Sequence, residues 1–215
     1  MDNAGGHLVH AASIFNEIIM VSKKVILASQ SPRRRQLLEW AEIPFDVIVK
    51  ETDESYPSEL SVEEIAIHIA SNKAKAIASD HHHDIPVIAA DTIVVLDNKI
   101  IGKPKDRADA LQTLASLSGR EHRVITGVVI AYKHELISFA DVSYVDFHEL
   151  TPDQIAFYVD KYKPYDKAGA YAIQEWIGVV GIKSISGDFY NVMGLPVSRV
   201  IKELERLINP FIGEE

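Results

Sequence analysis

The chain has 215 residues, enough for one well-packed core, and its 47% hydrophobic and 25% charged residues are typical of a globular protein. It has no cysteine, which excludes disulfides, thiolate metal sites and a cysteine nucleophile. The net charge of −9 argues against general nucleic-acid binding, and no apolar run approaches the roughly 18 residues of a membrane helix. We therefore expect a cytoplasmic protein that binds neither nucleic acid nor membrane.

Residues 1–23 precede the first clear element. They lack the basic segment of a signal peptide, since no Lys or Arg occurs before Lys23. We expect a disordered or loosely docked extension; alternatively, Met20 is the true initiator. Residues 24–215 are expected to form a single catalytic domain.

A short buried strand is predicted over residues 25–28, and a polar turn and an amphipathic helix follow it. Pro32 suits the first helical position and Ser31 the N-cap. A helix N-terminus favours anions, and arginine side chains match phosphate oxygens. Because basic residues in a first turn oppose the helix dipole, we interpret this turn as a phosphate-binding site rather than an ordinary capped helix. Its candidate groups are Ser29, Ser31, Arg33 and Arg34.

A second strand is predicted over residues 43–49, and an acidic loop containing Glu54 follows it. Ser61 and Glu64 have the spacing of a capping box, which opens an amphipathic helix. Lys73 lies on that helix and is a further candidate site residue.

The apolar run 85–90 predicts a buried central strand that ends at Asp91 and Thr92, before a second apolar strand over residues 93–96. A carboxylate between two apolar strands is costly unless it is paired or bound to metal. Asp91 is therefore the leading candidate for a functional acid, the alternative being an aspartate that only caps a turn. Lys103 follows on a loop between glycine and proline.

The second half of the chain predicts a helix from Asp106, two long strands over residues 121–132 and 136–147, and a helix from Thr151. A last strand is expected over residues 177–185, followed by a turn into one final helix. Strands that alternate with helices, with hairpins in the middle, predict an α/β fold with a mixed twisted sheet and flanking helices.

Several basic groups and two or three acids thus remain as candidates, a set that suits a polyphosphate bound with a divalent cation. They are Ser29, Ser31, Arg33, Arg34, Glu54, Lys73, Asp91, Lys103, Lys167 and Gln174.

The chain resembles the Maf family of nucleoside triphosphate pyrophosphatases over about residues 24–207. The motifs that carry the resemblance are residues 29–34, 53–54, 72–74, 90–92, 102–104, 126–127, 166–174 and 187–196. The resemblance implies two α/β lobes around a central cleft, and cytoplasmic hydrolysis of a nucleoside triphosphate between its α- and β-phosphates. It also implies dependence on Mg²⁺ or Mn²⁺ and, since similar proteins often pair, a homodimer.

The resemblance also implies roles for single residues. Asp91 corresponds to the proton acceptor, and Glu54 with Asp91 to the metal site. The substrate-binding positions are Ser29, Ser31, Arg33, Arg34, Lys73, Lys103 and Lys167. Arg34, Thr92 and Gln174 match positions associated with substrate choice. The segment 166–174 resembles the branch that acts on dTTP and UTP, and a glutamine amide offers the donor and acceptor that a pyrimidine edge can match.

Two other functions remain open. The same basic cleft suits a phosphohydrolase acting on other small phosphoesters. Alternatively, the protein is a nucleotide-binding regulator of cell division, as the septum-formation name of the similar family suggests.

Overall fold

The structure is a computed structural model that describes residues 23–78 and 84–208. The predicted extension over residues 1–23 thus lies outside the described residues, apart from Lys23. The described strands are β1 (Val25–Leu27), β2 (Phe45–Val47), β3 (Val87–Leu96), β4 (Lys99–Ile101), β5 (Glu121–Tyr132), β6 (Glu135–Phe147) and β7 (Ile182–Ser186). The helices are α2 (Pro32–Trp40), α3 (Val62–Ala78), α4 (Arg107–Leu117), α5 (Pro152–Tyr162), the 3-10 turn η1 (Ala168–Ala170), α6 (Trp176–Gly181), α7 (Phe189–Met193) and α8 (Val197–Ile208).

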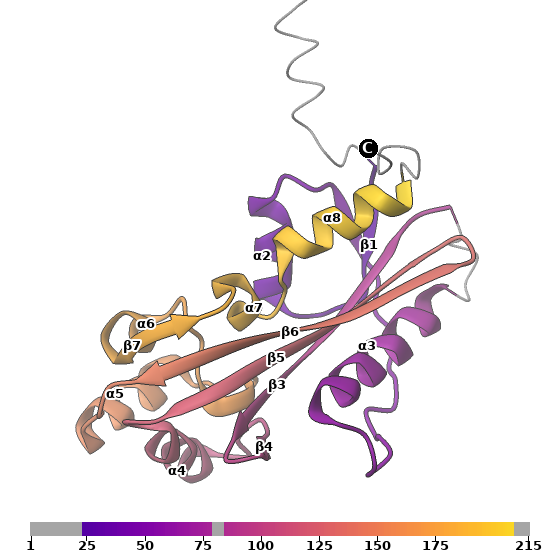
Figure 1. The fold of residues 1–215 in the computed structure, drawn as a ribbon. Coiled ribbons are helices and arrows are strands. Elements are labelled where there is room, and N and C mark those ends of the chain that lie inside the picture. The colour runs from indigo at the N-terminus through magenta and orange to yellow at the C-terminus, as the bar shows by residue number, and fades with distance from the viewer. Residues whose placement is uncertain (1–22, 79–83, 209–215) are drawn as a thin grey trace, which may run out of the picture.

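The described strands form one mixed sheet in the order β2-β1-β3-β5-β6-β7, with β4 paired to β3 (Figure 1). β1 runs parallel to β2 and β3, whereas β3, β5 and β6 form long antiparallel pairs. The turn from β3 to β4 uses Asp97 and Asn98 at φ values of 49° and 61°, a conformation that Asp and Asn tolerate. The predicted mixed α/β fold and its central hairpins are confirmed.

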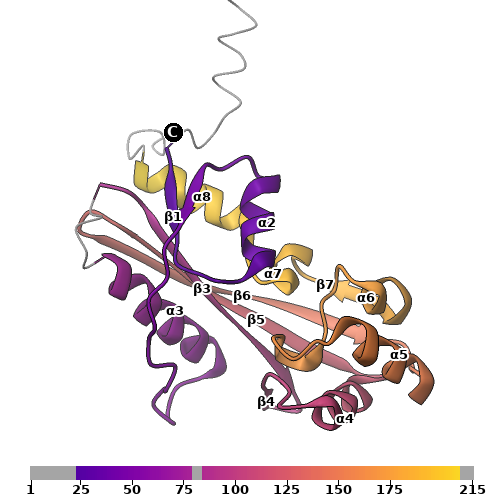
Figure 2. The same cartoon turned by 180° about the vertical axis from the view of Figure 1, so that it is seen from behind.

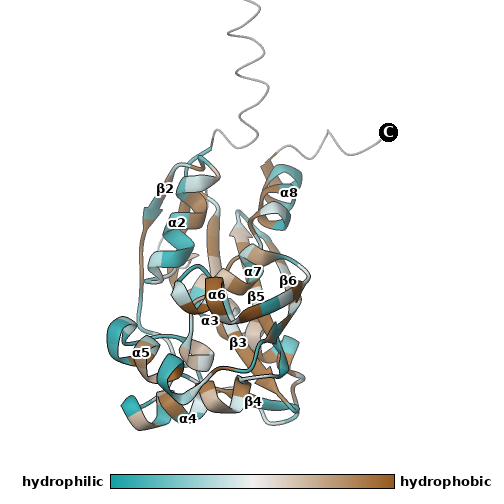
Figure 3. Cartoon of the chain, turned by 90° about the vertical axis from the view of Figure 1, so that its left-hand side faces the viewer, coloured by the Kyte–Doolittle hydropathy of each residue, from teal (hydrophilic) through white to brown (hydrophobic). Residues whose placement is uncertain are grey.

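Alternate residues of the strands face opposite sides of the sheet, as the period of two requires, and the buried hydrophobic residues form three clusters. Ala89 and Val129 pack with Ala74 of α3 on one face. Ala90 and Val128 point the other way, into the larger core that α2, α4, α5 and α8 help to build. Figures 1 and 2 show α3 on one side of the long strands, with α2 and α8 near one end and α4 and α5 near the other. Figure 3 shows the same layering by hydropathy: the central strands are mostly hydrophobic (brown), and the helices around them carry hydrophilic turns (teal).

Three sequence predictions about elements were wrong. Residues 87–96 form one continuous strand, so Asp91 lies inside β3 rather than between two strands. Residues 176–181 form helix α6, and only β7 remains of the strand predicted over 177–185. The expected single final helix is divided into α7 and α8, because Gly194 adopts a φ of 118° and Pro196 follows it. None of the helices in the described part of the chain is long and apolar enough to cross a bilayer.

Candidate active site

A cavity of about 690 Å³ opens beside an uncovered edge of β3. β1 pairs with β3 only as far as Ile88, and β4 pairs with it from Val94 onward. Within the described residues, no strand covers this edge at Asp91 and Thr92. Neighbouring residues of a strand point to opposite faces, yet both of these residues line the cavity. The cavity therefore wraps around the edge of β3 and reaches both faces of the sheet.

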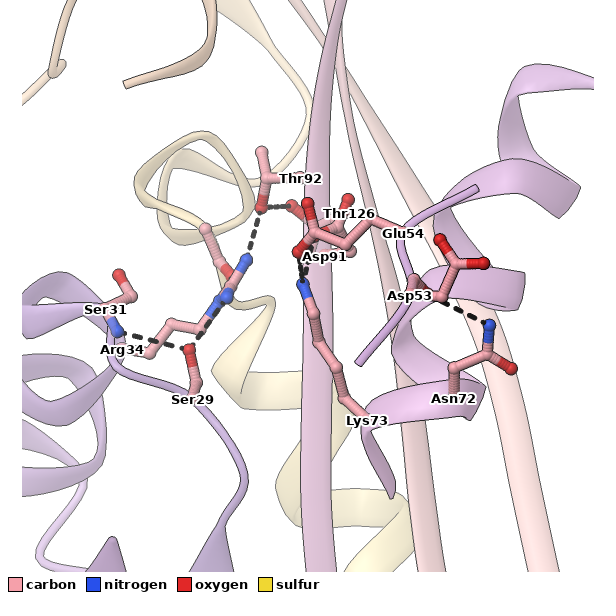
Figure 4. Close-up of polar contacts among 11 residues, drawn as sticks. Ser29, Ser31, Arg34, Asp53, Glu54, Asn72, Lys73, Asp91, Thr92 and Thr126 are labelled. Carbon is pink, nitrogen blue, oxygen red and sulfur yellow. Dashed lines mark hydrogen bonds and ion pairs between the residues drawn. The ribbon is translucent and has the colours of Figure 1, made fainter. Parts of the chain in front are cut away.

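Lys73 of α3 joins two carboxylates from different parts of the chain (Figure 4). Its Nζ lies 2.7 Å from Asp91 Oδ1 and 2.8 Å from Glu54 Oε1. The side chains of Lys73 and Asp91 are each 19% exposed, so this contact is shielded from water more than an ordinary surface ion pair. The hydrogen bond from Lys73 is the main reason why the pKa of Glu54 lies below its usual value.

Gly127 of β5 allows α3 to come close enough for this contact. A Cβ at Gly127 would lie 2.3 Å from the carbonyl carbon of Ala66, so any larger residue would push the α3 backbone away from the sheet. The Thr126-Gly127 motif thus has a packing role that sets the position of Lys73.

Arg34 is buried on the other side of the cavity and uses all three of its nitrogens (Figure 4). Nε donates to the Gly194 carbonyl oxygen at 2.8 Å, Nη1 to Ser29 Oγ at 2.9 Å and Nη2 to Thr92 Oγ1 at 3.0 Å. Burial lowers the pKa of Arg34 to about 10, so the guanidinium keeps its charge at neutral pH. Arg34 is therefore a fixed cationic part of the cavity wall.

The start of α2 is arranged as predicted, with one difference. Pro32 is at the first helical turn and Ser31 is the N-cap, but the Ser31 side chain makes no capping hydrogen bond. The Ser31 N–H instead donates to Ser29 Oγ at 3.3 Å. Both serines and Arg33 line the cavity, so the positive end of α2 faces it.

The cavity brings together most of the predicted site residues but not all of them. Those that line it are Ser29, Ser31, Arg33, Arg34, Glu54, Lys73, Asp91, Thr92 and Lys103. Lys167 and Gln174 line a neighbouring hollow of about 370 Å³ instead. Arg33 and Asp166 line both spaces, and their side chains approach to 3.8 Å.

Lys167 is held by acids rather than directed into the main cavity. Its Nζ lies 2.8 Å from Asp166 and 3.7 Å from Glu175, and the residue is 8% exposed. Glu175 also accepts a short hydrogen bond from the Tyr158 hydroxyl, which in turn accepts from the Ala172 N–H at 3.1 Å. These contacts fix the segment that carries Gln174, whose buried Oε1 has no hydrogen-bond partner in the described structure.

Thr126 and Asn191 are buried polar residues behind the cavity to which the sequence assigned no role. Thr126 Oγ1 lies 3.0 Å from Thr92 Oγ1 and 3.1 Å from the Asn191 carbonyl oxygen. In the sequence, Thr126 interrupts the apolar residues 124–131 and belongs to the 126–127 motif, but neither signal indicated this contact.

The donor set suits a divalent cation that takes part of its coordination from a ligand. Glu54 and Asp91 converge on one cation, the Lys73 ammonium, and Mg²⁺ is commonly bound by one or two carboxylates together with substrate phosphates. In residues 23–78 and 84–208, no group of three or more His, Asp or Glu side chains is placed to hold a metal ion. The two carboxylates thus fit an ion that arrives with a phosphate ligand.

Comparisons with known proteins match nearly the whole described chain. The Maf-like protein family model matches residues 24–207. A dTTP/UTP pyrophosphatase from Cytophaga hutchinsonii is 50% identical over 186 residues, which cover 86% of this chain and 85% of that protein. A dTTP/UTP pyrophosphatase from Phocaeicola vulgatus is 48% identical over 185 residues, covering 86% and 96%. Among solved structures, the Staphylococcus aureus Ham1 protein matches with a TM-score of 0.46 and 18% identity, covering 85% and 98%.

Proposed function

Because this chain belongs to the Maf family, we propose that it hydrolyses dTTP and UTP to the corresponding monophosphate and pyrophosphate. The observation that carries the proposal is the Lys73 ammonium held between Asp91 and Glu54 in the wall of the cavity. This arrangement places a candidate proton acceptor beside groups that bind phosphate. The pyrimidine nucleotides are proposed from the names of the relatives.

The charge distribution supports a polyphosphate ligand. Arg33, Arg34, Lys73 and Lys103 all line the cavity, in a chain whose net charge is −9. The lining also contains the acids Glu51, Glu54, Asp91 and Asp166, a mixture that suits a phosphate ligand bound with a divalent cation. The cationic groups and the start of α2 therefore suit the phosphates of a nucleotide.

We propose that Glu54 and Asp91 hold Mg²⁺ or Mn²⁺ together with oxygens of the substrate. Such an ion would polarise the phosphoryl oxygens and help to offset the charge that develops on them.

Asp91 is the proposed proton acceptor. Lys73 fixes its Oδ1, which leaves Oδ2 to take a proton from the attacking water. The water oxygen forms a bond to phosphorus, the bridge between the α- and β-phosphates breaks, and pyrophosphate leaves with the electron pair of the broken bond. Arg33 and Lys103 are placed in the cavity wall to stabilise the charge on the departing group.

Product analysis tests this function. The protein is incubated with Mg²⁺ and separately with dTTP, UTP and p-nitrophenyl phosphate, and the products are identified by phosphorus NMR. We expect monophosphate and pyrophosphate from both nucleotides. Release of a diphosphate and inorganic phosphate, or turnover of p-nitrophenyl phosphate alone, would instead support the phosphohydrolase alternative.

We also propose a cytoplasmic location and a homodimer, both supported by the family resemblance. Light scattering coupled to size-exclusion chromatography tests the dimer, and a mass near the 23.9 kDa of one chain would contradict it.

A further inference from the structure

A chain of hydrogen bonds runs from the cavity wall into the protein interior. Arg34 Nη2 donates to Thr92 Oγ1 at 3.0 Å, and the hydroxyl oxygens of Thr92 and Thr126 lie 3.0 Å apart (Figure 4). Thr126 Oγ1 lies 3.1 Å from the carbonyl oxygen of Asn191. Thr92 lines the cavity, whereas Thr126 is fully buried.

The end of this chain determines which hydroxyl donates to which. A carbonyl oxygen can only accept, so the contact with Asn191 is a hydrogen bond only if Thr126 donates its single proton there. Thr126 then has no proton left for Thr92, and Thr92 must be the donor between the two hydroxyls. The reverse order would leave two acceptors facing each other at 3.1 Å inside the protein, which is costly.

The acceptor at the end of the chain is held firmly. The Asn191 carbonyl oxygen also accepts from the Gly194 N–H at 2.9 Å. The Asn191 side-chain amide donates to the Val124 carbonyl oxygen at 3.1 Å and to Ser143 Oγ at 2.9 Å. Because Asn191 is fully buried and bonded to two strands, its carbonyl cannot turn away from Thr126.

Thr92 therefore meets a ligand as an acceptor. Its proton points inward to Thr126, one lone pair accepts from Arg34, and the remaining lone pair is available to the cavity. A phosphate oxygen would face that lone pair without a proton between them. The ligand group that suits this position is a hydrogen-bond donor, an N–H or an O–H.

We propose that Thr126 is a positioning residue that keeps the Thr92 hydroxyl an acceptor, so that the site selects the ring N3–H of uracil and thymine over the unprotonated N3 of cytosine. This inference rests on the proposed function for its substrates. The Arg34 guanidinium beside Thr92 supplies donors next to the acceptor, which complements a ring N–H flanked by carbonyl groups.

Two substitutions of Thr126 distinguish the effect of its hydroxyl group from the effect of its shape. Thr126→Val keeps the shape and removes the hydroxyl, so the Thr92 proton is free to turn toward the cavity and donate to cytosine N3. Thr126→Ser keeps the hydroxyl. Ser118→Ala is the matched control, because it removes a hydroxyl that accepts from the Leu150 N–H at 2.7 Å outside the cavity.

The readout is the preference for UTP over CTP, measured as the ratio of kcat/KM values. The ratio of Kd values for the α,β-methylene analogues of both nucleotides, which resist cleavage at the bridge, is measured in parallel. We expect wild type to prefer UTP, Thr126→Val to lose about tenfold of that preference, and Thr126→Ser and Ser118→Ala to keep it.

An unchanged preference in Thr126→Val, an equal loss in Thr126→Ser, or a wild type without any preference would overturn the inference. Failure of the wild type to release pyrophosphate from UTP would overturn the proposed function instead. In that case the Kd ratios of the analogues still decide the role of Thr126.

Discussion

Lys73 holds together two acids that would otherwise repel each other. Asp91 comes from the sheet and Glu54 from the loop after β2, and both reach the same ammonium group. Without that cation, two neighbouring carboxylates disfavour each other's charged forms. Lys73 therefore holds both carboxylates at the cavity and keeps the pKa of Glu54 below its usual value.

The effect of Lys73 on the pKa of Glu54 can be measured. The hydrogen bond from Lys73 is the largest cause of the lowered Glu54 pKa, so Lys73→Met is expected to raise that pKa. Carbon NMR titration of the glutamate carboxyl groups measures the change. Lys75→Met, on an exposed position of the same helix, is the control and should leave the Glu54 pKa where it is.

Residues whose chemistry conflicts with their surroundings were predictable from the sequence. Asp91 was identified because a carboxylate among apolar residues needs a partner, and that partner is Lys73. Thr126 was noted only as part of the 126–127 motif and was given no role, because its contact with Thr92 spans 34 residues of sequence. The orientation of Lys167 depends on its sequence neighbour Asp166 and on Glu175, and a sequence pattern does not show that the lysine side chain is held by these two acids.

The N-caps Ser31 and Thr151 differ in what their side chains do. Thr151 forms a complete capping box with Gln154 at the start of α5, whereas the Ser31 side chain makes no capping bond at the start of α2. A helix start that leaves its N–H groups without a side-chain partner keeps them for a ligand.

This difference predicts that alanine substitutions at the two caps affect different properties, stability at Thr151 and ligand affinity at Ser31. Thr151→Ala is expected to lower the free energy of unfolding by about 1 kcal/mol, and Ser31→Ala by less than about 0.5 kcal/mol. Urea unfolding measures both. The affinity for inorganic pyrophosphate, measured by calorimetry, should fall only in Ser31→Ala. Equal stability losses in the two variants, with unchanged pyrophosphate affinity, would show that Ser31 is an ordinary cap.

Element boundaries were predictable where caps and turns define them and wrong where only an apolar run was available. The capping box at residues 61–64 correctly predicted the start of α3, and the helix predicted from Thr151 does begin there, as α5. The run 176–185 fits a strand or a helix equally well by periodicity. In the structure the chain turns so tightly here that a Cβ on Gly178 would lie 1.7 Å from the Ile173 carbonyl oxygen, and the segment 176–181 is a helix.

The larger core reaches both ends of the sheet, and a buried histidine within it makes stability depend on pH. His122 is 2% exposed, and its Nε2 lies 2.8 Å from the Tyr171 hydroxyl. Burial lowers the pKa of His122 from 6.5 to about 4, so the folded protein holds it neutral. Tyr171 lines the cavity, which connects this buried pair to the site.

The sign of the pH effect follows from this lowered pKa. Between pH 6.5 and 4, His122 is protonated in the unfolded chain but stays neutral in the folded protein. Because the unfolded state binds more protons, the free energy of unfolding should fall as the pH drops through that window. The difference corresponds to roughly 3 kcal/mol by about pH 4. Urea unfolding at pH 7 and pH 4.5 should show a smaller pH effect in His122→Gln than in wild type. His148→Gln, at an exposed position, is the control, and an equal pH effect in all three proteins would contradict the argument.

The chain is arranged around the uncovered edge of β3, where Asp91 lies. One comparison of rates tests whether Asp91 is the proton acceptor. Steady-state pyrophosphate release from UTP is measured for wild type, Asp91→Asn and Asp97→Asn, the last being an exposed turn residue outside the cavity. Asp91→Asn is expected to lose about a hundredfold or more of the wild-type rate while unfolding cooperatively like wild type, and Asp97→Asn to keep its rate. An Asp91→Asn protein that works within a few-fold of wild type would contradict the assignment of the proton acceptor to this cavity.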